Sequence, residues 1–507
     1  PSVLDNIVVG VSAVTEKPNI VLIMTDQQRA DTIAELGHPW MQTPNLDRLV
    51  KQGTSFTNCF VTSPVCVSSR ASVFLGAYPH TTNVYTNFET WQPNWVSWLA
   101  QAGYHCVNIG KMHINPYDAK GGFHQRFFVE NKDRPLFLED HERALYDEWD
   151  KALKAHGLEK PSRYTRVRDD RDAFLQNLGC FTWETDDDMH PDNFVGDTAI
   201  WWLEDRKADS PFFLQIGFPG PHPPYDPTDD FLALYKDTKF PHRAASQQEV
   251  AEQPKMHQQL RQSMVDFNID SVAWRENLTD EDIQRLHRYY SANVSMIDQK
   301  VGQIMDSLDK QGYLDNTIII FCSDHADALG EHGHIQKWTM YDCVTRVPLV
   351  FWAPNWIKQQ QQCGDLVQLM DIAPTILNFA GIKTPENWEA LALNKILTDG
   401  VWDDTDPETT LRQYVYAELG RDHIQSGAEY VIMRRDKHWK YVIYPGSEEG
   451  ELYNLTEDPR ELKNLWNEPD FRVQRKDAAI EILSWSSLGN FRGHRPPPKK
   501  PQAPMKI

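Results

Sequence analysis

Polar and charged side chains stand at the ends of four predicted strands. The residues that follow these apolar runs are Asp26, Lys111, His222 and Asp324. In an open α/β sheet, ligands bind in the crevice beyond the carboxyl ends of the parallel strands. Carboxylate oxygens suit a hard divalent cation, whereas a few local cations can hold an anionic group. The positions alone therefore predict one site that contains both kinds of side chain.

A cysteine opens another stretch of interest, SPVCVSSRASVFLG at residues 63–76. Cys66 is followed four places later by Arg70, and the small and apolar residues beyond predict a helix that closes on Gly76. A single cysteine of this kind is usually a small core residue. Without support from other motifs, Cys66 would be one more buried thiol.

Strand-like runs that alternate with helical patterns must position these residues. Strands are predicted at residues 19–25, 104–110, 211–218 and 317–323, and helices at residues 45–52 and 93–102. This alternation predicts an α/β domain with a large doubly wound, mixed sheet flanked by helices.

The pattern changes after about Lys383. Shorter strands at 413–419, 429–434 and 438–444, with a helix near 470–483, predict a smaller antiparallel α+β subdomain. We place the large domain at 18–383, the C-terminal subdomain at 384–490 and a basic, proline-rich tail at 491–507.

Composition excludes several classes of protein. Of the 507 residues, 40% are hydrophobic, which is enough for a packed globular chain. The net charge of −21 argues against nucleic acid as a partner, because phosphate backbones are bound by clustered lysine and arginine. Seven widely spaced cysteines without a C-x-x-C pair argue against a disulfide-dense scaffold.

The ends of the chain and its apolar runs bear on location. No apolar run approaches the ~18 residues of a membrane span. The chain begins at Pro1 rather than methionine, which indicates a processed or trimmed N-terminus. We expect export to a periplasmic, extracellular or lysosome-like compartment, with a cytoplasmic location as the alternative.

Further motifs follow one another in a fixed order. They are PNIVLIMTDQQR (18–29), TPNLDRL (43–49), GKMH (110–113), FPGPHPP (218–224), SDHADALGEHG (323–333) with Lys337, and ELYNL (451–455). With the stretch around Cys66, they resemble the motifs of type I sulfatases, the formylglycine-dependent family of the alkaline phosphatase superfamily. The resemblance runs from about residue 19 to residue 465. It implies an alkaline-phosphatase-like fold and hydrolysis of sulfate esters, with a sulfated carbohydrate as the expected substrate.

The resemblance also implies a metal site. Its ligands would be Asp26, Gln27, Asp324 and His325, completed by an oxygen of the converted Cys66. Many sulfatases have aspartate and asparagine where Gln27 and His325 stand. We expect one Ca²⁺ at these ligands, and the imidazole makes Mn²⁺, or else Mg²⁺, the alternative.

Catalytic roles follow from the same resemblance. Cys66 would be oxidised to formylglycine by the host's formylglycine-generating machinery, and the aldehyde hydrate would attack sulfur. Ser68 stands where the family's oxidation signal usually has proline or alanine. The other implied roles are stabilisation of the hydrate by Arg70, sulfate contact by Lys111, base catalysis by His113, and sulfate binding with protonation of the leaving oxygen by His222 and Lys337.

Two other functions stay open. The Asp-Gln and Asp-His pairs are also similar to those of phosphonate and phosphate ester hydrolases of the superfamily, but these lack the lysine of Gly-Lys-x-His. Lys111 therefore favours sulfate. The remaining alternative is a non-catalytic protein that binds sulfated glycans and keeps Cys66 unoxidised.

Overall fold

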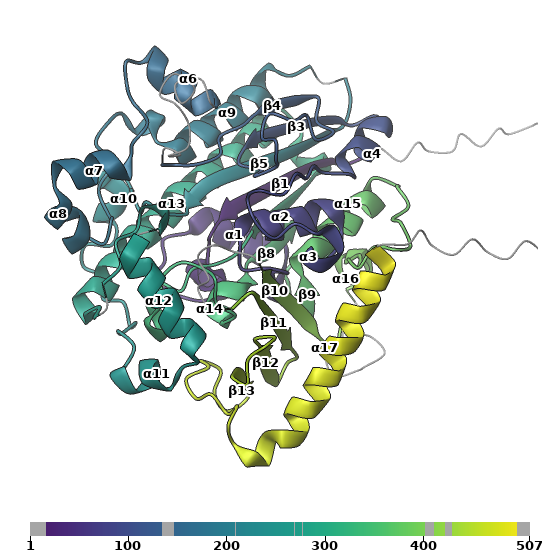
Figure 1. Cartoon of the computed structure of the whole chain (residues 1–507). Helices are drawn as coiled ribbons and strands as arrows, with labels where there is room; N and C mark the ends of the chain where they lie inside the picture. Colours follow the sequence, from purple (N-terminus) through teal and green to yellow (C-terminus); the bar gives the residue numbers. More distant parts are fainter. Residues whose placement is uncertain are drawn as a thin grey trace, which may run out of the picture.

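The computed structural model describes residues 17–133, 147–207, 209–267, 269–275, 277–400, 410–420 and 428–493. Within these ranges, a large mixed sheet is covered by helices on both faces, and a smaller antiparallel sheet lies towards the C-terminus (Figure 1). This arrangement confirms the predicted α/β fold with a smaller antiparallel part.

The large sheet is built around neighbouring parallel strands. Its order is β4-β3-β5-β1-β6-β8-β2-β7, and β9 pairs with β2. Five neighbouring strands, β4, β3, β5, β1 and β6, are parallel to one another. Strand β8 runs antiparallel to β6 and to β2. The strands are β1 (Asn19–Asp26), β2 (Thr54–Phe60), β3 (His105–Gly110), β4 (Gln125–Phe127), β5 (Phe212–Pro221), β6 (Thr317–Ser323), β7 (Arg346–Val347), β8 (Leu349–Trp352) and β9 (Gln361–Gln368).

The central strand β1 explains why the sheet is covered on both faces. All eight of its residues are buried, as expected for a parallel strand between two helical layers. Ile20 and Leu22 face one hydrophobic core, and Val21 and Ile23 face the other, because side chains alternate along a strand. Helices α2 (Cys66–Leu75), α4 (Val96–Gln101) and α15 (Ile372–Phe379) contribute to the first core, and α1 (Pro44–Gln52), α9 (Pro191–Asp205) and much of α13 (Asp280–Lys310) to the second.

The helices of the large domain connect these strands. They are α1 (Pro44–Gln52), α2 (Cys66–Leu75), α3 (Pro79–Thr82), α4 (Val96–Gln101), α6 (Glu148–Ala155), α7 (Arg163–Asp169), α8 (Arg171–Gln176), α9 (Pro191–Asp205), α10 (Asp229–Ala233), α11 (Gln247–Glu252), α12 (Lys255–Phe267), α13 (Asp280–Lys310), α14 (Asp342–Thr345), α15 (Ile372–Phe379) and α16 (Asn394–Asp399). No helix in the described part of the chain is both long and apolar enough to cross a membrane.

The smaller sheet joins the large one through a side-chain amide. Its strands are β10 (Val415–Gly420), β11 (Tyr430–Arg435), β12 (Trp439–Ile443) and β13 (Gly450–Asn454), in that order and antiparallel. Gln368, at the end of β9, donates from Nε2 to the Tyr416 carbonyl and accepts from the Tyr416 amide. The boundary at 383/384 stays a prediction.

The C-terminal helix α17 (Arg472–Gly493) runs along the small sheet (Figure 1). It continues beyond residue 483, where the predicted helix ends, because no proline interrupts it before Pro496. The first residues of the predicted tail therefore belong to α17. The rest of that tail, residues 494–507, lies outside the described residues.

A buried ion-pair network fastens the small sheet to the large domain. Lys440, on β12, is fully buried, and its Nζ lies 2.6 Å from Asp342 Oδ1 and 2.5 Å from Glu461 Oε1. The ammonium also donates to the Met340 carbonyl at 2.8 Å. Because Asp342 opens α14, a few residues after Lys337, this network holds the chain that carries a predicted site residue.

We expect Lys440→Met to lower the free energy of unfolding by about 3–5 kcal/mol, since the change leaves the buried Glu461 carboxylate without its cation, whereas Asp342 keeps its ion pair with Arg435. Urea unfolding followed by circular dichroism measures the loss. The matched control is Lys383→Met, which breaks an ion pair with Glu386 whose two side chains are 84% and 81% exposed. The control should cost no more than about 1 kcal/mol, and equal midpoints for both variants would contradict the prediction.

Candidate active site

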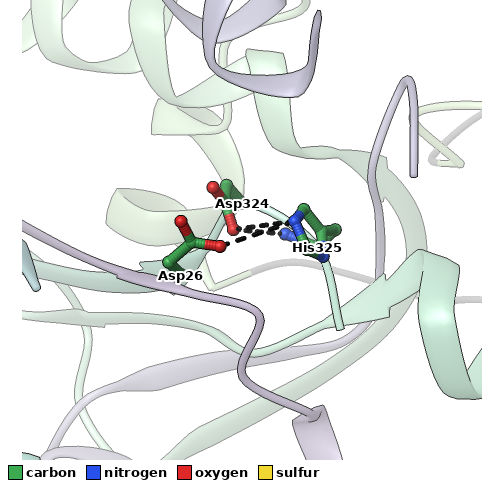
Figure 2. A group of neighbouring side chains, drawn as sticks. All are labelled: Asp26, Asp324 and His325. Atoms are coloured by element: carbon green, nitrogen blue, oxygen red, sulfur yellow. Dashed lines mark hydrogen bonds and ion pairs between the residues drawn. The ribbon is translucent and has the colours of Figure 1, made fainter. Parts of the chain in front are cut away.

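Two parallel strands bring a cluster of potential metal ligands together. β1 and β6 are neighbours with Thr25 opposite Ser323, so the residues that follow, Asp26 and Asp324, emerge side by side. His325 Nε2 lies 3.5 Å from Asp26 Oδ1 and 3.8 Å from Asp324 Oδ1 (Figure 2). All three side chains are fully buried.

The hydrogen bonds of this cluster fit a bound cation. His325 Nδ1 lies 3.0 Å from the Ala326 carbonyl, which can only accept, so Nδ1 carries the proton. The lone pair of Nε2 then faces two carboxylates. Among the described residues, Asp26 Oδ1 receives no hydrogen bond, and Asp26 Oδ2 has the Lys111 ammonium as its ion-pair partner. Buried acceptors that converge in this way are costly unless a cation lies between them, so the donor set suits a divalent metal.

Gln27 is held next to this cluster by a carboxylate that the sequence analysis did not single out. Its backbone amide donates to Asp324 Oδ1 at 3.1 Å, and its Nε2 donates to Asp327 Oδ2 at 2.7 Å. Asp327 also accepts from Tyr225 Oη at 2.6 Å, which fixes its orientation. Because Nε2 is anchored, Gln27 Oε1 remains as an oxygen that can bind a metal. This oxygen accepts a hydrogen bond from Lys337 Nζ at 3.5 Å. The signal for Asp327 was its place in the SDHAD motif.

Helix α2 presents Cys66 and Arg70 to the same site. Cys66 is the first residue of α2 and is 5% exposed. One turn later, the fully buried Arg70 donates from Nε to Asp324 Oδ2 at 2.7 Å and from a terminal nitrogen to the Lys111 carbonyl at 3.0 Å. Burial lowers the pKa of Arg70, but Asp324 and Asp26 outweigh burial and raise it. The positive end of the helix therefore lies at the thiol, with a permanent cation beside it.

Lys111 and Lys337 bring two ammonium groups to the site. Lys111 Nζ forms an ion pair with Asp26 Oδ2, and Lys337 Nζ lies 3.1 Å from His222 Nε2. Burial lowers the pKa of each lysine, but anionic groups outweigh it and raise the pKa, chiefly Asp26 for Lys111 and Cys66 for Lys337. Both lysines therefore remain charged at neutral pH.

His113 is a half-buried, neutral imidazole. Its backbone has a φ of 61°, and its amide donates to Glu130 Oε2 at 3.0 Å. Burial lowers the pKa of His113 to about 3, and the charge of Lys111 adds to this effect. Its Nδ1 has no hydrogen-bond partner in the part of the chain that the structure describes. A neutral ring with an unused nitrogen can accept a proton at neutral pH.

His222 has its ring fixed from behind. Its Nδ1 lies 2.8 Å from the Pro223 carbonyl and must donate to it, so Nε2 faces Lys337. Asp270 Oδ2 lies 3.6 Å from the same Nε2. Asp270 is not predicted from the sequence, because it lies in a segment without a strand or motif to mark it.

The fold thus brings the predicted residues to one region at the carboxyl ends of β1, β3, β5 and β6. The members of this region are Asp26, Gln27, Cys66, Arg70, Lys111, His113, His222, Asp324, His325 and Lys337. Their individual catalytic and metal-binding roles stay predictions.

Protein-family models match nearly the whole of this architecture. The model described as "Sulfatase" matches residues 18–382. A second model, "N-sulphoglucosamine sulphohydrolase, C-terminal", matches residues 330–483.

Solved structures with the same fold include sulfatases and a phosphonate hydrolase. A protein in complex with its substrate D-glucosamine-2-N,6-O-disulfate has a TM-score of 0.71 at 23% identity, covering 95% of this chain and 100% of that one. The phosphonate monoester hydrolase of Agrobacterium radiobacter has a TM-score of 0.74 at 23% identity, covering 93% and 96%. These likenesses establish the fold.

Curated relatives are similar over almost their full lengths. The arylsulfatase of Clostridium perfringens is 28% identical, covering 94% of this chain and 96% of the relative. The choline-sulfatase of Rhizobium meliloti is 31% identical, covering 90% and 83%. The N-acetylglucosamine-6-O-sulfatase of Bacteroides thetaiotaomicron is 25% identical, covering 91% and 85%. Together, the family model and these relatives show that the protein belongs to the sulfatase family and is a sulfatase.

Proposed function

We propose that this sulfatase removes sulfate from a carbohydrate. It uses a nucleophile made from Cys66 and, in addition, one divalent metal, which we expect to be Ca²⁺. The observation that carries the proposal is that three positively charged side chains, Arg70, Lys111 and Lys337, interact electrostatically with Cys66, and that Arg70 also binds the buried cluster of metal ligands through Asp324. Sulfuryl transfer needs this combination, because negative charge on the sulfate oxygens must be neutralised while the nucleophile attacks.

Formylglycine would give residue 66 two hydroxyls once its aldehyde is hydrated, one to attack sulfur and one to expel sulfate afterwards. The protein's own groups then have separate tasks. Arg70 and Lys111 hold negative charge next to residue 66. The neutral His113, whose Nδ1 has no hydrogen-bond partner among the described residues, accepts the proton that is released when the sulfated intermediate breaks down.

The metal would be held by Asp26, Gln27, Asp324 and His325 and would supply Lewis acidity towards the sulfate oxygens. On the other side of the site, Lys337 and His222 hold the ester oxygen. Their nitrogens lie 3.1 Å apart, so one leaving oxygen can contact both. Proton donation from this pair to the departing alkoxide completes cleavage of the sulfur–oxygen bond.

A carbohydrate substrate is supported by the N-acetylglucosamine-6-O-sulfatase among the relatives. The phosphonate hydrolase fold keeps phosphonate or phosphate esters as the competing substrates. Lys111 favours sulfate, because the similar phosphorus ester hydrolases lack the lysine of the Gly-Lys-x-His motif. We also propose that the protein is exported and that host machinery generates its formylglycine; fractionation of the native host tests the location.

Matched 4-nitrophenyl esters of sulfate, phosphate and phenylphosphonate test the proposal. We expect protein that carries the aldehyde to release nitrophenol fastest from the sulfate ester, and to release sulfate from members of a panel of sulfated oligosaccharides. Faster turnover of a phosphorus ester would contradict the assignment. Binding of the oligosaccharides without any turnover would favour the non-catalytic alternative.

Lys111→Ala should lower kcat/KM for the sulfate ester by about 10²-fold, since the variant loses one preorganised cation. The phosphorus esters should lose less. Lys120→Ala is the control, because Lys120 is an exposed lysine nine positions further along the chain. An equal loss for sulfate and phosphorus esters would remove Lys111 as the reason for sulfate selectivity.

A further inference from the structure

An acidic side chain contacts both groups that the proposed function assigns to the leaving oxygen. Asp270 lies in the described segment 269–275, which precedes α13. Its Oδ2 lies 3.3 Å from Lys337 Nζ and 3.6 Å from His222 Nε2. Neither the sulfate nor the metal requires an anion at this position, so Asp270 needs a different explanation.

The backbone around Asp270 is held in an unfavourable conformation. Asp270 has a φ of 56° and Ser271 a φ of 65°, and two consecutive non-glycine residues in the left-handed region are uncommon and costly. The turn is fixed from two sides. The Ser271 hydroxyl donates to the Asp133 carboxylate, and the Ser271 carbonyl lies so close to Gly179 that a Cβ there would be 2.3 Å from it. The surrounding structure therefore directs the Asp270 carboxylate at the active site.

The side chains of Lys337, His222 and Asp270 are increasingly exposed, in that order. The side chain of Lys337 is 4% exposed, that of His222 is 13% exposed and that of Asp270 is 33% exposed. An alcohol whose ester oxygen contacts Lys337 and His222 must extend towards solvent, and Asp270 lies on that side. The atoms nearest to Asp270 would therefore belong to the leaving group rather than to the sulfate.

Asp270 is ionised at this position. Burial raises the pKa of its carboxyl group, but Lys337 and His222 outweigh burial and lower the pKa. A carboxylate only accepts hydrogen bonds, so its natural partner on a substrate is a hydroxyl.

We propose that Asp270 is a specificity residue that accepts a hydrogen bond from a hydroxyl adjacent to the sulfated position of the leaving alcohol. The inference rests on the proposed function, because it uses His222 and Lys337 as the groups at the leaving oxygen. It deepens that function by naming the substrate class as a sulfated polyol, such as a sugar with a free hydroxyl next to the ester. A phenol lacks that hydroxyl and gains nothing from the contact.

The first test compares Asp270→Ala with the unaltered protein on two kinds of ester. The probes are 4-nitrophenyl sulfate and the fastest substrate in a panel of glucose, galactose and N-acetylglucosamine monosulfates. A hydrogen bond to a charged group is worth about ten- to a hundredfold, so kcat/KM for the sugar should fall by that factor. The value for 4-nitrophenyl sulfate should change by less than about threefold, since its leaving group makes no such bond.

Two further measurements keep the test independent of folding. The second substrate is a deoxy sugar sulfate, in which hydrogen replaces the hydroxyl adjacent to the sulfate. In the unaltered protein, kcat/KM for the deoxy sugar should be lower than for the parent sugar by the same factor. Asp270→Ala should turn over the deoxy sugar and the parent sugar with equal kcat/KM. Asp270→Asn keeps an oxygen acceptor and should retain part of the sugar preference. Asp266→Ala, an exposed aspartate on α12, should behave like the unaltered protein.

Equal losses for the sugar and the aryl ester would overturn the inference, because Asp270 would then only position Lys337 and His222. A deoxy sugar turned over as fast as its parent would overturn it as well. Failure of the proposed function looks different, since the unaltered protein that carries the aldehyde would then turn over a phosphorus ester faster than the sulfate ester, or release sulfate from no sugar in the panel.

Discussion

Replacing Cys66 with alanine is expected to lower sulfate release by at least about four orders of magnitude, because the variant has no nucleophile at residue 66. The fold should survive, since no hydrogen bond joins the thiol to a residue that the structure describes and the volume lost is small. A sulfate-release assay, with urea unfolding as the folding check, measures both effects.

Two variants sharpen this result. Cys106→Ala removes another buried cysteine, on β3, and should leave turnover unchanged. Cys66→Ser keeps one hydroxyl and should retain sulfate on the protein, because a serine lacks the second hydroxyl that breaks the covalent ester. Turnover in Cys66→Ala within about tenfold of the unaltered protein would exclude Cys66 as the nucleophile precursor.

Removal of the metal is expected to have an effect of similar size. A chelator should abolish turnover and lower resistance to urea, and added Ca²⁺ should restore both, since a ligand that binds the folded state stabilises it. Asp26→Asn should lose about three orders of magnitude in kcat/KM that excess Ca²⁺ does not recover. The variant loses this activity because Asp26 is a fully buried, ionised carboxylate. Burial raises the pKa of Asp26, but Lys111 and His222 outweigh burial and hold the pKa well below its usual value.

Asp298→Asn is the control for this prediction. Asp298 is also a buried carboxylate, and burial raises its pKa to about 6, but it contacts α1 through Asn45 and Leu46 rather than the active site. The control variant should keep its turnover and its response to Ca²⁺. Full activity after exhaustive chelation would rule out a metal at the Asp26 cluster.

Much of the large sheet was predictable because its central strands are continuous apolar runs. β6 has the predicted range 317–323, and β1 extends one residue beyond the predicted range 19–25. The polar residues that follow these strands marked the site, since parallel strands end at one edge. β9 was not predicted, because its sequence QQCGDLVQ is largely polar and carries neither strand pattern.

The parts of the site that the sequence did not reveal depend on tertiary contacts. Asp327 acts on Gln27 across a separation of 300 residues, and Asp270 reaches Lys337 only because Ser271 is fixed against Asp133 and Gly179. No local periodicity or capping pattern encodes such contacts. The family resemblance supplied the residues that we propose to contact sulfate, whereas the residues that orient them needed the structure.

The most direct test of the account is the mass of the tryptic peptide 52–70 from protein made in its native host, compared with turnover per mole in the same preparations. This peptide contains Cys59 as well as Cys66, so the buried Cys59 serves as an internal reference that keeps its thiol. We predict that Cys66 alone shows the mass loss of conversion to formylglycine, and that turnover rises in proportion to the converted fraction. Equal turnover in preparations with and without converted Cys66 would contradict the account.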